Sequence, residues 1–370
     1  MRIAIIFDLT EPGGVQTCVF SLIKGLNRKK IIPILIWDQP PNPDLLKDNN
    51  VEIIFMQKKF NISTKFIKKF PDSIRYLLRP FNLIKVSDLS DEFQFIYSFT
   101  PFLLIDKLKP HLIYLSGPPL IPQIEPKSIR FKLIKIIYKS LIKPFKPAYE
   151  LQQNANYVVN SQYIASLFAQ AYNKTVDIVY PSNQLSFIET SIEDFQNRKL
   201  ITFFSRIVQY KRPELILELA VRWPDLNFAI VGNVSKNRLG YYIKIKRLIK
   251  AKRIKNLELY TNLNRKELDE ILKKTKFYFF PAINEHFGIT TVEAISKGCI
   301  PFVHDSGGQK EIVAIDELRF KNEELFDKFD NIIHLPHFVL ENYRKMLIQN
   351  CSKFKEEVFI EKILQKLLLI

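Results

Sequence analysis

The segment from Lys276 to Val313 constrains the fold more than any other part of the sequence. It opens with an aromatic run at Phe277–Pro281, which is typical of a short strand ended by the proline. A polar loop, a helix-forming stretch, Gly298 and a second apolar run at Cys299–Val303 follow. Strand, loop, helix and strand make one unit of a parallel α/β sheet, in which ligands bind at the carboxyl ends of the strands.

The helix after the loop has a predicted start and end. Thr290 or Thr291 can cap its first turn, and Gly298 suits the left-handed position after its last residue. Free N–H groups and a partial positive charge at the start of a helix attract a phosphate. We therefore expect an anionic ligand near Gly288.

Two glutamates lie eight residues apart in this segment, Glu285 in the loop and Glu293 in the helix. A carboxylate would repel a nearby phosphate, so these side chains are better suited to accept hydrogen bonds from ribose or sugar hydroxyls. Together with backbone amides near Phe287 and Gly288, they predict a nucleotide-sugar pocket. In isolation the two acids would be better explained as surface glutamates favoured by the helix dipole.

The surrounding residues favour the pocket, because NEHFGITTVEAISKGCIPFVHDSGG resembles the donor-site signature of retaining GT-B glycosyltransferases of family 4. It is most similar to that of the mannosyltransferases that extend lipid-linked oligosaccharides and of their archaeal relatives. The resemblance implies that Glu285 faces the donor sugar and that Glu293 holds the nucleotide ribose. The other residues expected to contact the donor are His286, Phe287, Gly288, Ile289 and Thr290.

Composition sets wider bounds. A length of 370 residues predicts two domains, and the net charge of +17 implies an acidic partner such as nucleotide phosphates, nucleic acid or an anionic membrane. The three cysteines, Cys18, Cys299 and Cys351, have no C-x-x-C spacing and are expected to be reduced and buried. No signal peptide or spanning apolar run is recognisable. We expect a cytoplasmic protein, peripheral to a membrane where it binds one.

The first half of the chain begins with a strand at Arg2–Phe7, a loop containing Gly13 and Gly14, and a helix at Val15–Leu26. A pair of glycines between strand and helix lets backbone approach a diphosphate, although a plain tight turn explains it equally well. The resemblance favours contact with the donor phosphates, because the family has a Gly-rich loop here.

Ser116 and Gly117 follow the predicted strand Leu112–Leu115 and are expected on the acceptor side of the site. The sequence departs here from much of the family, which often has a histidine in this region. Tyr114 and Ser116 stand near that place, whereas His111 is expected at the far end of the strand.

A basic segment at Lys127–Lys146 contains seven cations and no acid. A helix here would gather cations on one side and apolar residues on another, which is typical of a membrane-surface helix. A solvated helix packed on the core remains the alternative. The residues expected to face the membrane are Lys132, Lys135, Lys139 and Lys143.

Arg206 and Lys211 follow the predicted strand Leu200–Ser205 that opens the second half. Two cations on a loop are unremarkable in a lysine-rich chain, but the pattern R-x-x-x-x-K-R-P resembles the diphosphate site of the family. We therefore expect both residues to bind the donor diphosphate and to act in catalysis.

These observations predict an α/β protein with the GT-B fold, in which two Rossmann-like domains with parallel sheets face a central cleft. The predicted parts are an acceptor-side domain at 1–184, a linker at 185–199, a nucleotide-sugar domain at 200–345, and a C-terminal helix at 346–370 that packs back on the first domain.

The predicted activity is retaining transfer of a hexose from a nucleotide-diphosphate sugar to a glycan or lipid-linked acceptor. The resemblance favours GDP-mannose over a UDP-sugar. No metal or other cofactor is expected, since the sequence has no D-x-D motif and no His/Cys cluster. A GT-B epimerase or phosphorylase would use the same cleft without a large acceptor. A basic nucleic-acid-binding protein is the remote alternative, without a recognisable RNA-binding sheet motif, zinc spacing or helix-turn-helix.

Overall fold

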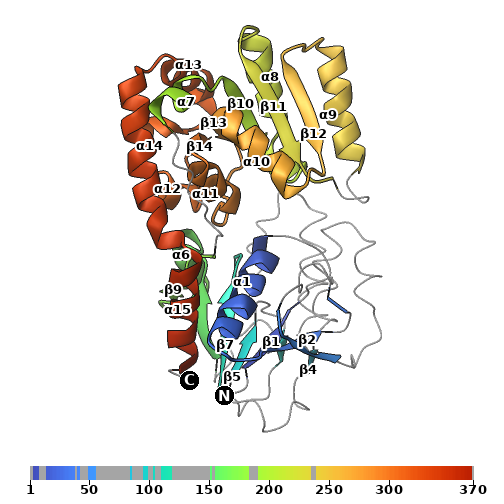
Figure 1. The fold of residues 1–370 in the computed structure, drawn as a ribbon, viewed down its shortest axis with the longest axis vertical. Coiled ribbons are helices and arrows are strands. Elements are labelled where there is room, and N and C mark those ends of the chain that lie inside the picture. Colours follow the sequence, from blue (N-terminus) through green and yellow to red (C-terminus); the bar gives the residue numbers. More distant parts are fainter. Residues whose placement is uncertain are drawn as a thin grey trace. The chain divides into compact units, whose positions relative to one another are not determined.

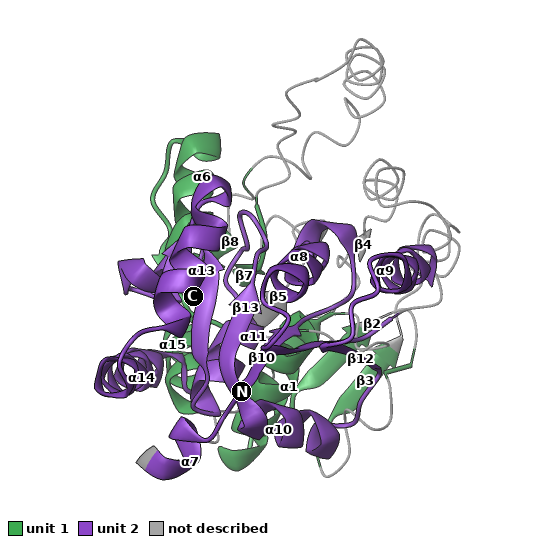
Figure 2. Cartoon of the chain, turned by 90° about the horizontal axis from the view of Figure 1, so that it is seen from above, with its two compact units in different colours: residues 1–182, 356–370 green, residues 183–355 purple. Residues whose placement is uncertain are grey.

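A computed structural model describes residues 3–7, 14–37, 40–41, 49–55, 84–85, 95–98, 103–104, 110–118, 151, 155–182, 191–234 and 239–368. The chain forms two compact units, coloured separately in Figure 2. Unit 1 comprises residues 1–182 and 356–370, and unit 2 comprises residues 183–355. Each unit has its own parallel sheet, as the sequence predicts for an α/β chain.

The sheet of unit 1 has seven parallel strands in the order β3-β2-β1-β5-β7-β8-β9 (Figure 1). All four residues of β1 are buried, which explains its uninterrupted apolar sequence, since helices cover both faces of such sheets. The strands are β1 Ile3–Ile6, β2 Ile34–Trp37, β3 Glu52–Phe55, β5 Phe95–Ser98, β7 His111–Leu115, β8 Ala155–Val159 and β9 Asp177–Ile178. Two further strands, β4 Ile84–Lys85 and β6 Leu103–Leu104, pair with each other.

Three helices of unit 1 are described: α1 Gly14–Arg28, α6 Gln162–Tyr172 and α15 Glu356–Leu368. The Ser161 hydroxyl accepts a hydrogen bond from the amide of Ile164 and caps the first turn of α6. Asn173 ends the helix in the left-handed conformation.

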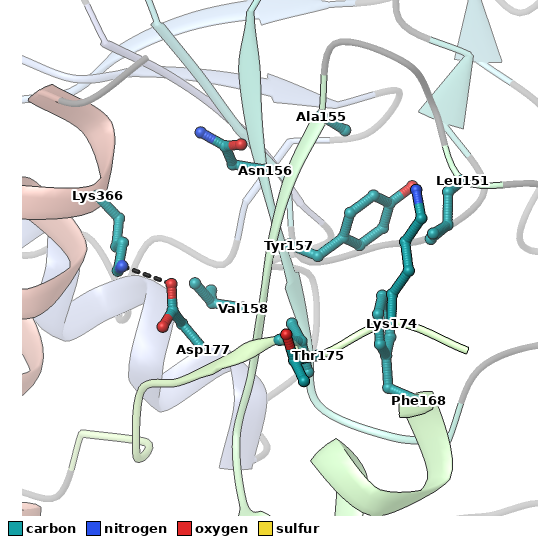
Figure 3. A pocket seen from close by; sticks show the side chains of 11 residues that line it. Leu151, Ala155, Asn156, Tyr157, Val158, Phe168, Lys174, Thr175, Asp177 and Lys366 are labelled. Carbon is teal, nitrogen blue, oxygen red and sulfur yellow. Dashed lines mark hydrogen bonds and ion pairs between the residues drawn. The ribbon is translucent and has the colours of Figure 1, made fainter. Parts of the chain in front are cut away.

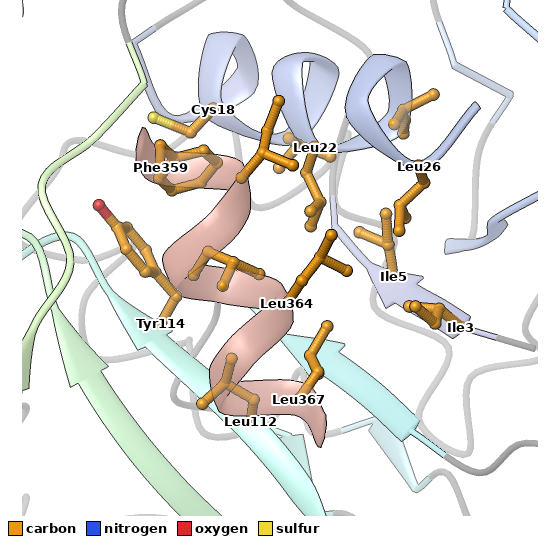
Figure 4. Close-up of a cluster of buried hydrophobic side chains, with 14 of the residues drawn as sticks. Ile3, Ile5, Cys18, Leu22, Leu26, Leu112, Tyr114, Phe359, Leu364 and Leu367 are labelled. Atoms are coloured by element: carbon orange, nitrogen blue, oxygen red, sulfur yellow. The ribbon is translucent and has the colours of Figure 1, made fainter. Parts of the chain in front are cut away.

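The C-terminal helix α15 packs on α1 and on β7 within unit 1 (Figure 4). Its apolar residues Phe359, Leu364 and Leu367 join Leu22 of α1 in one buried cluster. The first turn of α15 is anchored by charge, because buried Glu356 accepts a hydrogen bond from Ser21 at 2.9 Å and pairs with Arg28 at 3.2 Å. The last segment of the chain thus completes the core of the first unit.

The sheet of unit 2 has six parallel strands in the order β12-β11-β10-β13-β14-β15. Its first strand, β10, lies inside the sheet, and successive strands are added on one side and then on the other. The direction of addition reverses between β10 and β13, which is the switch point at which doubly wound sheets bind ligands. The strands are β10 Leu200–Phe204, β11 Asn227–Gly232, β12 Leu257–Thr261, β13 Thr275–Phe280, β14 Ile300–His304 and β15 Arg319–Phe320.

The α-helices of unit 2 follow the predicted alternation with strands (Figure 1). Asn264 and Glu267 form a capping box at the start of α10. Of the helices in the described ranges, none is long and apolar enough to cross a membrane. The α-helices are α7 Ile192–Gln196, α8 Glu214–Arg222, α9 Leu239–Ala251, α10 Arg265–Lys274, α11 Ile289–Ser296, α12 Gln309–Ile312, α13 Leu325–Ile333 and α14 His337–Cys351. Short 3₁₀ turns lie at Gln209–Lys211, Asp316–Leu318, Asn322–Glu324 and Ser352–Phe354.

The structure differs from the predicted domain limits at two places. The predicted linker 185–199 contains α7, whose Phe195 is buried in unit 2 beneath the guanidinium of Arg344. The predicted continuous helix at the C-terminus is broken at Ser352–Phe354, because Phe354 turns inward to pack on Phe287. The division between the units therefore falls after residue 355 and not after residue 345.

Close packing of α1 on α15 generates a first prediction. A Cβ at Gly25 would lie 2.5 Å from the Cδ1 atom of buried Ile360. Gly25→Ala should therefore lower the free energy of unfolding by about 1–3 kcal/mol, as overpacked cores do. Denaturant unfolding of the single variants and the double variant Gly25→Ala/Ile360→Ala measures the coupling. The double variant should be more stable than the sum of the single effects, and strict additivity would contradict the contact.

Candidate functional site

The loops after β10 and β13 meet at the switch point of the unit 2 sheet. β10 and β13 are neighbouring parallel strands, so their carboxyl ends lie at the same edge. Arg206 and Lys211 lie in the loop after β10, and Glu285 lies in the loop after β13. The topology therefore brings together predicted site residues that are far apart in the sequence.

The ammonium of Lys211 forms an ion pair with the carboxylate of Glu285. Lys211 is only 7% exposed, and the Glu285 side chain is 19% exposed. A charge this deeply placed needs a partner, because removing one member of a buried pair leaves the other uncompensated. Lys211 also lies over the ring of Phe280, with 5.1 Å between Nζ and the ring centroid.

Tyr210 lies between the two predicted cations. The Cζ atom of Arg206 is 5.9 Å from the Tyr210 ring centroid, and the Nζ atom of Lys211 is 5.5 Å from it. Both distances are within cation–π range. Unlike Lys211, Arg206 is exposed and is free to reach a ligand at the strand ends.

A glycine turn after β14 holds the backbone of the Glu285 loop. The amide of Gly308 donates to the carbonyl of Glu285 at 2.8 Å, and the amide of Asn284 donates to the Ser306 hydroxyl at 2.8 Å. A Cβ at Gly308 would lie 2.5 Å from the carbonyl oxygen of His286, so only glycine permits this approach. Gly307 is equally confined and has a φ of +66°. The glycine turn therefore fixes the position of the Glu285 loop relative to the sheet.

The start of α11 differs from the predicted one. Gly288, with a φ of 116°, precedes the helix, and neither Thr290 nor Thr291 caps it, because both lie inside its first turn. Thr290 instead hydrogen-bonds the Tyr278 hydroxyl at 2.7 Å, and Thr291 donates to buried Gln309 at 2.9 Å. No side chain of this helix therefore caps the first amides of α11. Uncapped amides at a helix start are suited to bind an anion.

Gly298 takes the left-handed conformation, as predicted, with a φ of 77°. The other predicted donor residues of this loop differ in placement. His286 is exposed, whereas the ring of Phe287 packs in the core at 5.1 Å from the Phe354 ring. Ile289 is the half-buried first residue of α11. Phe287 can therefore contribute only its backbone to a ligand.

Glu293 belongs to a chain of four charges that joins α11 to α10. Its carboxylate pairs with Arg265 at 2.8 Å, Arg265 pairs with Asp269 at 3.2 Å, and Asp269 pairs with buried Lys297 at 3.2 Å. Burial raises the pKa of Glu293, while the charge and hydrogen bond of Arg265 act in the opposite direction. Arg265 therefore orients Glu293 and favours its ionised form.

Tyr278 of β13 connects the end of β10 with the start of α11. Its hydroxyl donates to the carbonyl of Phe204 at 3.1 Å, so it ties the end of β10 to the first turn of α11. Burial raises the pKa of Tyr278 well above its usual value, and the charges of Glu285 and Glu293 raise it further. The Tyr278 hydroxyl therefore stays protonated and can donate this hydrogen bond.

Several residues of this arrangement were missed by sequence reasoning. Tyr278 resembles any core aromatic of a strand, and Arg265 resembles one more cation of a lysine-rich helix. Gln309 follows the S-G-G turn, and only the structure shows its buried amide beneath Gly288. The partners of these three residues lie far away in the sequence, so no local pattern could indicate their roles. Tyr210 is different, because it lies next to Lys211 in the sequence and its ring contacts that cation.

The predicted residues of unit 1 lie around the starts and ends of its own elements. Gly14 is the first residue of α1, and Ser116 and Gly117 follow β7, where the Ser116 carbonyl accepts a hydrogen bond from Asn160. Tyr114 is a core residue whose hydroxyl donates to the carbonyl of Val179, and buried His111 opens β7. Gly13, Lys132, Lys135, Lys139 and Lys143 lie outside the described residues.

A pocket of about 600 Å³ in unit 1 contains none of the predicted site residues (Figure 3). It lies beside β8 and β9, where Lys366 of α15 pairs with Asp177. Both side chains of this pair retain contact with solvent. The described lining has no buried ion pair like that of Lys211 with Glu285 in the unit 2 loops. We therefore place the candidate site at the switch point of unit 2.

No three His, Cys, Asp or Glu side chains of the described ranges gather so that they could hold a metal ion. Cys18, Cys299 and Cys351 are buried and unpaired with one another, in agreement with the prediction. Burial raises the pKa of Cys18 to about 12, so its thiol stays protonated.

Comparison with protein families matches residues 187–354 to Glycosyl transferases group 1. Of the curated relatives, GDP-Man:Man(3)GlcNAc(2)-PP-Dol alpha-1,2-mannosyltransferase of Candida albicans is 23% identical over 159 residues, which are 38% of this chain and 26% of the relative. Alpha-1,3/1,6-mannosyltransferase ALG2 of Mus musculus is 22% identical over 237 residues, which are 56% of this chain and 57% of the relative. The chain thus spans between about a quarter and just over half of the length of these relatives.

Solved structures show the fold. The structure of Anabaena Alr3699/HepE in complex with UDP-glucose matches with a TM-score of 0.71 and 14% identity, covering 100% of both chains. Such neighbours have the GT-B fold, and the GT-B prediction is confirmed.

The glycine turn at the site generates a second prediction. Gly308→Ala should push the Glu285 loop away from the sheet and lower the free energy of unfolding by about 1–3 kcal/mol. Gly240→Ala is the matched control, because a Cβ at Gly240 in α9 would meet nothing within 4 Å. Denaturant unfolding of both variants measures the difference. Equal stability of the two variants would show that the loop does not depend on this approach.

Proposed function

We propose that this chain, in which residues 187–354 form a glycosyl transferases group 1 domain, is a retaining glycosyltransferase. It moves a hexose from a nucleotide-diphosphate sugar to a glycan or lipid-linked acceptor. Mannose carried by GDP is the favoured donor, and two of the curated relatives are named as mannosyltransferases. The observation that carries this proposal is the meeting of Lys211 with Glu285 at the switch point of unit 2.

Lys211 has a double role in the proposed site. An ammonium group has three donors, so it can keep its contact with Glu285 while it binds a phosphate oxygen. Arg206, which is exposed on the same loop, offers a planar fork to the second phosphate. Together the two cations neutralise the charge that develops on the leaving diphosphate, and this stabilisation needs no metal.

Glu285 orients the donor sugar. Its paired oxygen is held by Lys211, and the glycine turn fixes its backbone, which leaves the carboxylate little freedom. A carboxylate held in this way accepts hydrogen bonds from sugar hydroxyls and favours an oxocarbenium-like state at the anomeric carbon. Backbone groups of His286, Phe287 and Gly288 complete the sugar pocket.

Glu293 holds the ribose of the nucleotide. It is the fifth residue of α11, one turn beyond the helix start at which the phosphates are expected. Arg265 supports the ionised carboxylate, which can accept hydrogen bonds from two ribose hydroxyls. Gly14 contacts the donor phosphates, as the resemblance implies. Ser116 and Gly117 lie on the acceptor side.

A third prediction tests the activity. Glu285→Gln keeps an oxygen that accepts from Lys211 but removes the negative charge, so transfer should fall at least a hundredfold while nucleotide binding is nearly retained. Turnover of GDP-mannose and UDP-sugars, with thermal shifts on the same panel, measures both effects. Glu218→Gln, an exposed change on α8, is the control.

Three outcomes would contradict the proposal. Full turnover by Glu285→Gln would remove its catalytic role. A product that is an isomer of the donor, formed without acceptor, would indicate an epimerase. Retention on DNA without a thermal shift from any nucleotide sugar would indicate a nucleic-acid-binding protein.

A fourth prediction follows from the raised pKa of Glu293. Protonation removes the carboxylate that ribose hydroxyls need, so donor affinity should fall as pH is lowered, beginning above the range of an ordinary glutamate. Without donor, the folded state binds this proton more tightly than the unfolded chain, so the free energy of unfolding should fall as pH rises through the same window. Titration of donor binding with pH measures the first effect.

Glu293→Gln provides the control for this titration, since its side chain does not ionise. Arg265→Met should move the loss of affinity to higher pH, because it removes a charge that opposes protonation of Glu293. An identical pH profile for the wild type and Glu293→Gln would contradict the assignment of Glu293 to the ribose.

A further inference from the structure

The excess positive charge of unit 2 is concentrated in one element. In the described ranges 191–234 and 239–355, seven cations and no acid lie between Lys244 and Lys255. Outside this segment the same ranges carry twenty Lys and Arg against twenty Asp and Glu. The described part of unit 2 is therefore charge-balanced except at α9 and the turn that follows it.

The helix α9 presents these cations on a single face. With 3.6 residues per turn, the exposed residues of α9 lie within about 160° of the helix circumference. Lys244, Lys246, Arg247 and Lys250 are exposed on it, and Lys252, Arg253 and Lys255 are exposed in the turn. No carboxylate of the described residues lies within ion-pair distance of any of these seven cations.

The opposite face of α9 attaches the helix to unit 2. Ile245 is fully buried, and the Tyr241 hydroxyl donates to Glu214 of α8. Tyr242 lies beneath Lys246, with 5.7 Å between Nζ and the ring centroid. The helix is thus held in place by its inner face, which leaves the cationic face uncovered.

Apolar side chains interrupt the cationic face near the start of α9. Leu239 is 49% exposed and Ile243 is 38% exposed, and their spacing of four residues places them side by side on the helix. An aliphatic pair beside four cations is the arrangement of a helix that lies on an anionic bilayer. Aliphatic side chains would add little to the binding of a nucleic-acid backbone, which depends on cations.

We propose that the exposed face of α9, together with the turn to Lys255, binds the surface of a bilayer that contains anionic lipids. The cations contact the lipid phosphates, and Leu239 and Ile243 enter the region between the headgroups. Its residues differ from Lys132, Lys135, Lys139 and Lys143, to which the sequence assigned membrane contact. It does not depend on the proposed transferase activity, although it would hold such an enzyme near a lipid-linked acceptor.

The experiment is co-sedimentation of the full chain with vesicles of equal parts phosphatidylcholine and phosphatidylglycerol, and with vesicles of phosphatidylcholine alone. Lys246→Glu/Arg247→Glu/Lys250→Glu should weaken binding to the anionic vesicles about tenfold or more and should leave the neutral ones unbound. Lys274→Glu/Lys345→Glu/Lys362→Glu is the matched control, since it changes net charge equally at exposed positions of other helices.

Further variants keep the result interpretable. Lys246→Gln/Arg247→Gln/Lys250→Gln replaces the reversal if the latter fails to fold, and an unchanged midpoint of thermal unfolding shows that the variant is intact. Leu239→Ser/Ile243→Ser should reduce the binding that survives at high salt, because salt screens only the charges.

Three results would overturn the proposal. Equal loss of binding in the α9 reversal and the matched control would show that net charge acts without a defined surface. Wild-type binding by the α9 reversal would place the membrane contact elsewhere. Competition by duplex DNA that disappears only in the α9 reversal, with no loss of vesicle binding, would assign the surface to a nucleic acid instead.

Discussion

The candidate site depends on the ion pair between Lys211 and Glu285. An ammonium group that is almost fully buried is stable only beside an anion, so the loops after β10 and β13 must approach each other. The parallel pairing of β10 with β13 makes this approach possible, since it places both carboxyl ends at one edge. A donor diphosphate would enter a site in which the cation is already oriented by its acid.

The surroundings of this pair restrict movement from three sides. The glycine turn at Gly307 and Gly308 holds the Glu285 loop, and Tyr278 ties the end of β10 to α11. The charge chain through Arg265 joins α11 to α10. These contacts fix polar groups before a ligand arrives, which is how preorganised sites stabilise developing charge without reorganising.

Charge serves two purposes in unit 2. At the switch point each cation has an anionic or aromatic neighbour, so the charges orient one another and a bound ligand. On α9 the cations have no acid of the described residues within ion-pair distance, and their field extends into solvent. The first arrangement suits a small ligand held in one position, and the second suits an extended anionic surface.

Sequence alone determined the alternation of strands and helices, the left-handed conformation of Gly298 and the residue types of the donor loop. These features depend on contacts within a few positions, where periodicity and capping rules apply. Tertiary structure decided the start of α11, the helix break at Ser352–Phe354, the roles of Tyr278 and Arg265, and the isolation of charge on α9. Each of these results from a partner distant in the chain, or from its absence among the described residues, which local pattern cannot register.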